Sequence, residues 1–341
     1  MENDFIITNT MTRLNHILFV LLFFFVSASM ARQTTARELV WPSPPQQARI
    51  KHIQTISSIK DISEEPGFFS KVFSFLFGSK NIDRWLVQPV GIAVDRDGKL
   101  YIADPGINGI HILDIKKKDY RFLAETKFGA FKSPVGLAFS RDGTLYLSDS
   151  ERGEIFVLAG NEDVLFSIKN NIVRPTGLSI IGERLYVTDT GKNKVVVFDL
   201  TGNFLFEFGQ RGNGEGEFNF PVQLTFNNSL SVVDAMNFRI QQFTPDGKYV
   251  SSFGQIGSSA GSFANPKSVA RDSDGHLYVT DALLDNFQIF NNDGQLLLVV
   301  GSKGNADGEF TSPSGIAIDE SDNVYVVDSL NKRIQIFKYL K

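Results

Sequence analysis

Residues 313–337 read PSGIAIDESDNVYVVDSLNKRIQIF, and this stretch contains three short strands separated by turns. Residues 313–319 form one apolar segment, residues 320–323 a turn, and residues 324–328 a second apolar segment. After a polar loop, residues 333–337 alternate polar and apolar side chains, which is typical of a strand with one buried face. The stretch therefore predicts an antiparallel meander.

The same pattern occurs six times along the chain, and each copy begins at a proline. The copies begin at Pro89, Pro134, Pro175, Pro221, Pro266 and Pro313, with spacings of 45, 41, 46, 45 and 47 residues. A period in this range indicates a propeller, a solenoid or another array. Earlier copies add a turn and a fourth strand, as at residues 245–247 and 249–253. We predict an all-β fold, a six-bladed β-propeller of four-stranded antiparallel blades, because radial packing buries the sheet faces and hides most edges.

The two ends of the repeat region predict how the ring closes. The last copy stops after its third strand, close to Lys341. A strand-like run, residues 49–56, precedes the first copy and belongs to no repeat. We expect this N-terminal run to be the outer strand that completes the last blade.

Aromatic residues recur at fixed positions of the repeats and are interpreted as wedges between blades. One position holds Tyr101, Tyr146, Tyr186, Tyr278 and Tyr325, and another holds Phe218, Phe263 and Phe310. The fourth copy has Ser231 at the tyrosine position. A small cavity or a water site is expected there.

The N-terminal residues predict export. An apolar run at residues 17–26 follows Arg13 and precedes small residues, which is typical of a secretory signal over residues 1–31, with Met11 as an alternative start. An uncleaved membrane anchor is the alternative, although the run is shorter than the roughly 20 residues of a spanning helix. Residues 32–48 are rich in proline and predict an extended linker to a propeller at residues 49–341.

The repeats resemble the NHL-repeat family of six-bladed propellers, and most closely its exported bacterial members. The motifs that carry the resemblance are Pro89-Val-Gly-Ile-Ala-Val-Asp95, Leu185-Tyr-Val-Thr-Asp189 and Asn331-Lys-Arg-Ile-Gln-Ile-Phe337, together with the glycine-rich links at residues 209–218 and 301–310. The resemblance covers residues 49–341. It implies the fold strongly and the function weakly, because the family includes scaffolds, RNA binders and a zinc lyase.

An aspartate ends the second strand of every copy, and we interpret this set as structural. Its members are Asp104, Asp149, Asp189, Asp234, Asp281 and Asp328. An aspartate that opens a turn can accept hydrogen bonds from the backbone N–H groups of its own loop. All six copies carry it, whereas a metal site needs one asymmetric cluster, so no metal or other cofactor is predicted.

The sequence argues against several kinds of catalysis. The absence of cysteine excludes disulfides, thiolate metal sites and a cysteine nucleophile. The related zinc lyase holds its metal with channel histidines, but His52, His111 and His276 are expected on an outer strand, a third strand and a turn. The run Gly257–Gly261 spells a nucleophile elbow without the strand-to-helix turn that this motif needs. No catalytic residue is predicted.

Charge argues against nucleic acid as a partner. The formal net charge is −4, and the basic residues of the loops are offset by acidic ones. Phosphate binding requires a net positive footprint, so no nucleic-acid binding is expected.

Three candidate contact surfaces remain. Two loops are apolar where the equivalent loops are polar, and they contain Met236, Phe238, Leu283 and Leu284. At the channel mouth the residues after the prolines differ between blades and include Thr176, Gln223, Lys267 and Ser314. An insert at about residues 66–78 is predicted to form an apolar helix whose face contains Phe68, Phe69, Val72, Phe73 and Leu76.

Each surface has an alternative interpretation. The apolar loops could pack locally against one another, and the channel-mouth residues could face neighbouring blades. The insert could cap the propeller, lie on a membrane surface or dock on a partner.

We predict an exported, non-catalytic scaffold that binds protein partners. The alternative is an enzyme or small-ligand binder that uses the channel mouth, including a metal-dependent, lyase-like one. A third hypothesis is a membrane-associated module that works through residues 66–78.

Overall fold

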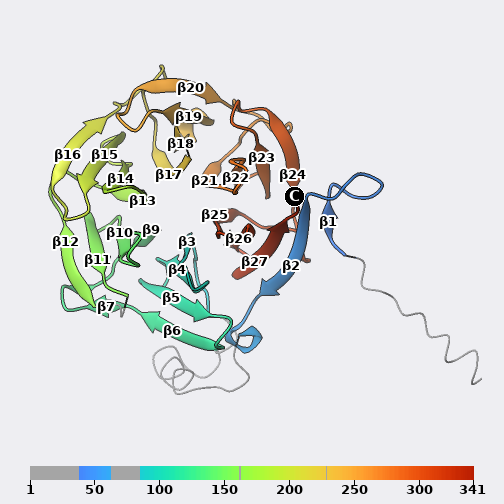
Figure 1. Cartoon of the computed structure of the whole chain (residues 1–341), viewed down its shortest axis with the longest axis horizontal. Helices are drawn as coiled ribbons and strands as arrows, with labels where there is room; N and C mark the ends of the chain where they lie inside the picture. Colours follow the sequence, from blue (N-terminus) through green and yellow to red (C-terminus); the bar gives the residue numbers. More distant parts are fainter. Residues whose placement is uncertain (1–37, 63–84, 161–162, 228) are drawn as a thin grey trace, which may run out of the picture. The chain divides into compact units, whose positions relative to one another are not determined.

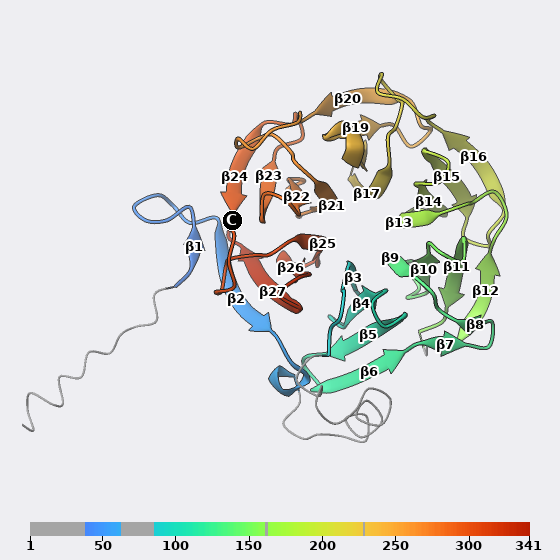
Figure 2. The same ribbon diagram turned by 180° about the vertical axis from the view of Figure 1, so that it is seen from behind.

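The structure is a computed structural model that describes residues 38–62, 85–160, 163–227 and 229–341. Residues Leu39–Lys341 form one compact unit, in which six antiparallel sheets are arranged radially around a central channel (Figure 1, Figure 2). Each sheet is one blade, and its strands are called a to d from the channel outward. The predicted all-β six-bladed propeller is therefore confirmed.

Successive hairpins build each blade. The a strands are β3 (Gly91–Val94), β9 (Pro134–Phe139), β13 (Pro175–Ile181), β17 (Pro221–Asn227), β21 (Pro266–Arg271) and β25 (Pro313–Ile318). The b strands are β4 (Leu100–Asp104), β10 (Leu145–Asp149), β14 (Arg184–Asp189), β18 (Ser229–Asp234), β22 (Leu277–Asp281) and β26 (Asn323–Asp328). Proline is tolerated at the start of the a strands because their inner edge faces the channel and has no partner strand.

The outer half of each blade completes the sheet. The c strands are β5 (Gly109–Asp114), β11 (Glu154–Leu158), β15 (Lys194–Asp199), β19 (Arg239–Phe243), β23 (Asn286–Phe290) and β27 (Arg333–Tyr339). The d strands are β6 (Asp119–Leu123), β12 (Val164–Ile168), β16 (Phe204–Phe208), β20 (Tyr249–Phe253), β24 (Leu296–Val300) and β2 (Ile50–Ile56). A short hairpin, β7 (Glu125–Thr126) with β8 (Gly129–Ala130), joins the first two blades. Helix within the described residues is limited to two 3₁₀ turns, η1 (Ile59–Asp61) and η2 (Ala235–Asn237).

The hydrophobic core lies between the blades. It consists of six clusters, and each cluster contains side chains from two neighbouring blades. Successive residues of a b strand point to opposite faces, so that Tyr101 packs toward the second blade and Ile102 toward the sixth. The b strands are consequently apolar on both faces.

The ring closes as predicted. β2 pairs antiparallel with β27, and His52 lies opposite Phe337. Ile50 and Ile56, at the ends of β2, are fully buried in two different interblade clusters. The N-terminal strand thus joins the C-terminal blade, and the two lie side by side in both views (Figure 1, Figure 2).

The end of the predicted linker takes part in the same sheet. β1 (Val40–Trp41) pairs with β2 and adds a fifth strand to the last blade. Trp41 packs edge-on against Phe337, with 5.8 Å between the ring centroids. An apolar pair at this edge fixes a segment whose prolines favour extended backbone, so residues 39–41 belong to the propeller.

The aromatic wedges lie between blades, as expected, but the position of Ser231 differs from the expectation. The Tyr146 and Tyr186 hydroxyls donate to the carbonyl oxygens of Leu200 and Pro245 in the next blade. At Ser231 the expected cavity or water site is replaced by the guanidinium of Arg271, whose Nη2 lies 2.8 Å from the serine Oγ. The longer arginine side chain fills the space that tyrosine occupies elsewhere.

The predicted signal at residues 1–31 and the apolar insert at residues 66–78, including Phe68, Phe69, Val72, Phe73 and Leu76, lie outside the described residues. Within the described ranges, no helix has the length and apolar character needed to cross a bilayer.

Candidate binding face and channel mouth

The b–c and d–a loops gather at one end of the propeller, and the b-strand aspartates hold them together. Asp281 accepts hydrogen bonds from the N–H groups of Leu283 and Leu284 in its own loop, at 3.0 and 3.1 Å. It also accepts from the N–H groups of Ala264 and Asn265, which precede the a strand. Equivalent bonds join each of the other five aspartates to the segment that enters its own blade. These bonds support the structural interpretation of the aspartates. Each aspartate also binds the segment that precedes the a strand of its blade, in addition to its own loop.

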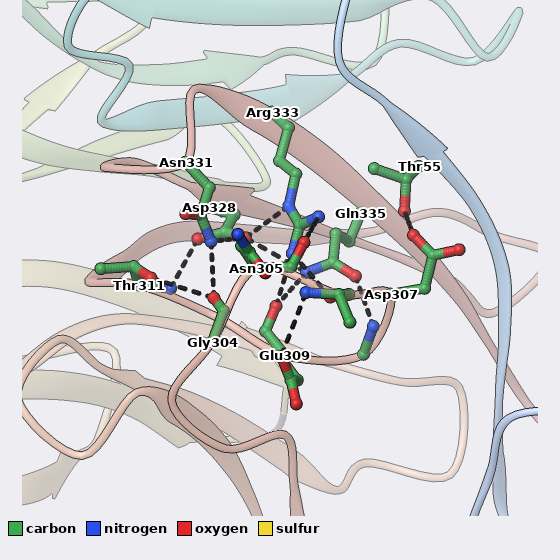
Figure 3. Close-up of polar contacts among 12 residues, drawn as sticks. Thr55, Gly304, Asn305, Asp307, Glu309, Thr311, Asp328, Asn331, Arg333 and Gln335 are labelled. Carbon is green, nitrogen blue, oxygen red and sulfur yellow. Dashed lines mark hydrogen bonds and ion pairs between the residues drawn. The ribbon is translucent and has the colours of Figure 1, made fainter.

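The last blade has the most extensive network of this kind (Figure 3). Arg333 Nε donates to Asp328 at 2.7 Å, and its Nη2 donates to the carbonyl oxygens of Ala306 and Glu309. Gln335 Nε2 donates to the Glu309 carbonyl oxygen, while its Oε1 accepts from the Gly308 N–H at 2.8 Å. These side chains hold the glycine-rich d–a loop in one conformation, which gives the face a rigid platform.

An apolar rim lies on this platform, and we define it as Met236, Leu283 and Leu330. Each side chain follows a b-strand aspartate by two residues, in the fourth, fifth and sixth blades. Their exposed fractions are 56%, 66% and 65%. The same position holds Gly106, Glu151 and Gly191 in the first three blades. The rim therefore covers one half of the face.

The apolar rim differs from the four residues predicted from the sequence. Leu284 is partly exposed beside Leu283. Phe238 has left-handed backbone (φ 55°) and packs against the core cluster between the fourth and fifth blades, so its side chain serves the fold. Leu330 was missed, although its offset from Asp328 equals that of Met236 from Asp234.

The four predicted channel-mouth residues lie together. Thr176, Gln223, Lys267 and Ser314 line one cavity of about 580 Å³ at the centre of this face. Two of the hydroxyls are already engaged, because Thr176 Oγ1 bonds to Thr188 and Ser314 Oγ donates to the Pro89 carbonyl oxygen at 3.3 Å. Leu330 also lines the cavity, so the apolar rim reaches the mouth.

Lys267 is the unusual residue of the cavity. Burial lowers the pKa of its ammonium group, although the charge of Asp281 acts in the opposite direction. Within the described residues, no carboxylate lies within ion-pair distance of it. A partly buried cation without a protein partner is costly, and such groups mark candidate binding sites.

The described residues do not fit a zinc site at the channel. His111 lies on the c strand β5, His52 on the d strand β2, and His276 in the a–b turn of the fifth blade. In this part of the chain, no three metal-binding side chains come together. A catalytic zinc needs about three protein ligands, so no step of a zinc-dependent reaction is derived from these residues.

Comparisons with known proteins agree with the fold. The family described as a six-bladed β-propeller (DUF5128) matches residues 167–253 and 264–339. The human E3 ubiquitin-protein ligase NHLRC1 is 33% identical over 76 residues, which are 21% of this chain and 19% of that protein. This chain thus spans about a fifth of the length of the curated relative that it matches.

Solved structures show the same architecture at low identity. An auxiliary nutrient binding protein from Bacteroides thetaiotaomicron has a TM-score of 0.60 and 14% identity, covering 75% of this chain and 70% of that one. Virginiamycin B lyase from Staphylococcus aureus has a TM-score of 0.55 and 14% identity, covering 74% of this chain and 95% of that one. Identities this low establish the fold alone.

Proposed function

We propose that this chain, a six-bladed β-propeller whose repeats resemble those of the NHL-repeat family, is an exported, non-catalytic scaffold whose b–c face docks a protein partner. Export is proposed from the apolar run at residues 17–26 and its flanks. Docking is proposed from the apolar rim. The neighbours that act on or bind other molecules support a binding role in general, since a propeller presents its loops on a rigid ring.

The observation that carries the proposal is the exposure of Met236, Leu283 and Leu330 on neighbouring blades. Their loops are held by aspartates and by main-chain hydrogen bonds, so these side chains are not required to order the loops. Adjacent exposed apolar side chains with a polar surround are typical of a protein-binding surface. The b–c loops of the second and third blades carry polar side chains instead, at Glu151 and Lys192.

The membrane-associated alternative depends on residues 66–78. A helix with Phe68, Phe69, Val72, Phe73 and Leu76 on one face would bind a lipid surface through apolar burial. We propose it as a second contact of the same exported protein, independent of the apolar rim.

The docking proposal is tested by cross-linking the purified protein to its partners in the native envelope fraction. We expect Leu283→Asp, alone or with Met236→Asp, to remove a discrete cross-linked species, because a charge at the centre of an apolar contact costs several kcal/mol. The matched control is Leu297→Asp, since Leu297 is a half-exposed leucine on the outer strand β24.

The control should retain the cross-linked species. Capture that is unchanged in the Leu283→Asp protein, with an unaltered thermal midpoint, would remove the apolar rim from the proposal. Loss in both variants would mean that the contact is not confined to this face.

A further inference from the structure

We propose that the channel mouth is a binding site for a small carboxylic acid with an apolar body, and that Lys267 holds the carboxylate. The inference goes beyond the docking of a protein partner, and it can be tested without any partner. It rests on the donors, the charges and the shape of the cavity.

The cavity offers hydrogen-bond donors that the protein itself does not use. Within the described residues, Lys267 Nζ makes no hydrogen bond, and neither does Lys332 Nζ. Gln223 Oε1 accepts from the Leu224 N–H at 2.9 Å, which leaves its Nε2 as a further donor. Two ammonium groups and an amide N–H around one cavity match the acceptor oxygens of a carboxylate.

The charge around the cavity favours an anion. Its lining includes Lys267 and Lys332, and no aspartate or glutamate of the described ranges belongs to it. The opposite charge that acts on Lys267 is that of Asp281, which is fully buried and whose oxygens accept hydrogen bonds from four main-chain N–H groups. Asp281 therefore lowers the cost of burying Lys267 without occupying its donors. An entering carboxylate would supply the missing partner.

The position of Lys267 is fixed by the fold, because the residue lies in a strand and not in a loop. It is the second residue of β21, directly after Pro266, and the neighbouring Ser268 bonds to Thr280 of β22 through its N–H. Burial lowers the pKa of Lys267, which is the response expected of a cation that lacks a partner. The equivalent residues are Val90, Val135, Thr176, Val222 and Ser314, so among these six positions only the one in the fifth blade carries a charged side chain.

The other residues that line the cavity indicate which chemical groups the rest of the ligand would carry. Val87, Val222 and Leu330 give the cavity an apolar wall. Ser314 and Ser329 both donate to the Pro89 carbonyl oxygen, so their lone pairs are free to accept an N–H group. A volume of about 580 Å³ lies in the range of small-molecule sites. An N-acylated amino acid has the carboxylate, the apolar body and the N–H group in one small molecule.

The test is calorimetric and NMR titration with N-acetylglycine, N-acetylleucine and N-acetylphenylalanine, each compared with its C-terminal amide. We expect at least one of the three carboxylates to bind. The affinity of its amide should be lower by roughly tenfold or more, because the amide cannot form an ion pair with an ammonium group. Lys267→Met keeps the length of the side chain and removes the charge, and it should abolish the preference for the carboxylate. The pKa of Lys267, followed by NMR, should rise on binding.

The matched control is Lys248→Met, which removes an exposed lysine from the c–d turn at the opposite end of the propeller. It should leave binding within about twofold of the wild type, since screened charges that far apart interact weakly. Lys267→Gln provides a second variant if Lys267→Met does not fold. The proposal fails if no carboxylate binds at millimolar concentration, if the amides bind equally well, or if both Lys267 variants bind like the wild type. Preference for inorganic phosphate over every carboxylate would also overturn it.

Discussion

The side chain seven residues after the b-strand aspartate holds the incoming loop in the last three blades and is of another type in the first blade. In the last three blades it is a glutamine, and Gln241, Gln288 and Gln335 each clamp a glycine-rich loop by accepting from an N–H group and donating to a carbonyl oxygen. In the first blade the position holds His111. Its Nδ1 lies 2.9 Å from the Tyr120 hydroxyl, and its Nε2 lies 3.4 Å from Asp104 Oδ2.

This exchange of glutamine for histidine makes the first blade sensitive to pH. Burial lowers the pKa of His111 below its ordinary value of about 6.5, although the hydrogen bond and charge of Asp104 oppose the shift. The folded protein therefore binds a proton at His111 less readily than the unfolded chain does, and the free energy of unfolding is expected to fall as the pH drops below about 6.5. The loss cannot exceed about 1.4 kcal/mol per pH unit for one group.

We therefore expect His111→Gln to reduce the loss of stability between pH 7.5 and pH 5.5. The glutamine repeats the arrangement of the last three blades and carries no titrating group. Urea denaturation of both proteins at the two pH values measures the difference. Equal losses in the wild type and the variant would show that His111 does not cause the effect.

At the scale of single elements, each blade interface contains a contact between one b-strand position and one a-strand position of the next blade. Five interfaces place a tyrosine against an apolar side chain, as Tyr278 and Ile318 do in one core cluster. The remaining interface places Ser231 against Arg271. Arg271 also donates to the Gly275 carbonyl oxygen, its Nε is buried without a partner, and burial lowers its pKa to about 10.

Substitutions at Ser231 and Arg271 should have strongly coupled effects on the free energy of unfolding. Arg271→Ile alone leaves a void and an unpaired hydroxyl, and Ser231→Tyr alone overpacks the arginine, so each should cost about 1–3 kcal/mol. The double variant reproduces the Tyr278–Ile318 interface and should return to within about 1 kcal/mol of the wild type. Chemical denaturation of the four proteins gives the coupling energy. Additive losses would mean that the two sites do not share one interface.

At the scale of the whole molecule, stability depends on closing the ring with the outer strand β2. Without β2, the last blade would expose the edge of β27, and Ile50 and Ile56 would leave two interblade clusters. An exposed apolar edge is a template for aggregation. Strand β1 protects the outer edge of β2 in the same way.

We expect deletion of residues 49–58 to produce an aggregating protein. A sharper version compares Ile56→Asp with Ile53→Asp, because Ile56 is fully buried and Ile53 is about half exposed on the same strand. The buried substitution should lower the thermal midpoint strongly and the exposed one little. Light scattering and thermal unfolding measure both. A soluble deletion variant with an unchanged midpoint would refute closure by β2.

The sequence by itself determined the number of blades, the order of strands in each blade and the strand that closes the ring. These features follow from local turn chemistry and from an apolar pattern repeated six times, so they are visible in a single chain. It also identified the four channel-mouth residues, because they break the symmetry of the repeat. The position of Leu330 was readable in the same way, from its offset after Asp328.

Only the tertiary structure decided which of these side chains are available. Phe238 packs inward while Leu283 remains exposed, Arg271 fills the space beside Ser231, and residues 39–41 add a strand to the last blade. Lys267 is partly buried without a protein partner because blades far apart in the sequence meet around the channel. Whether a side chain is exposed or unpaired depends on the residues of other repeats that pack against it. The sequence pattern of a single repeat carries no information about those residues.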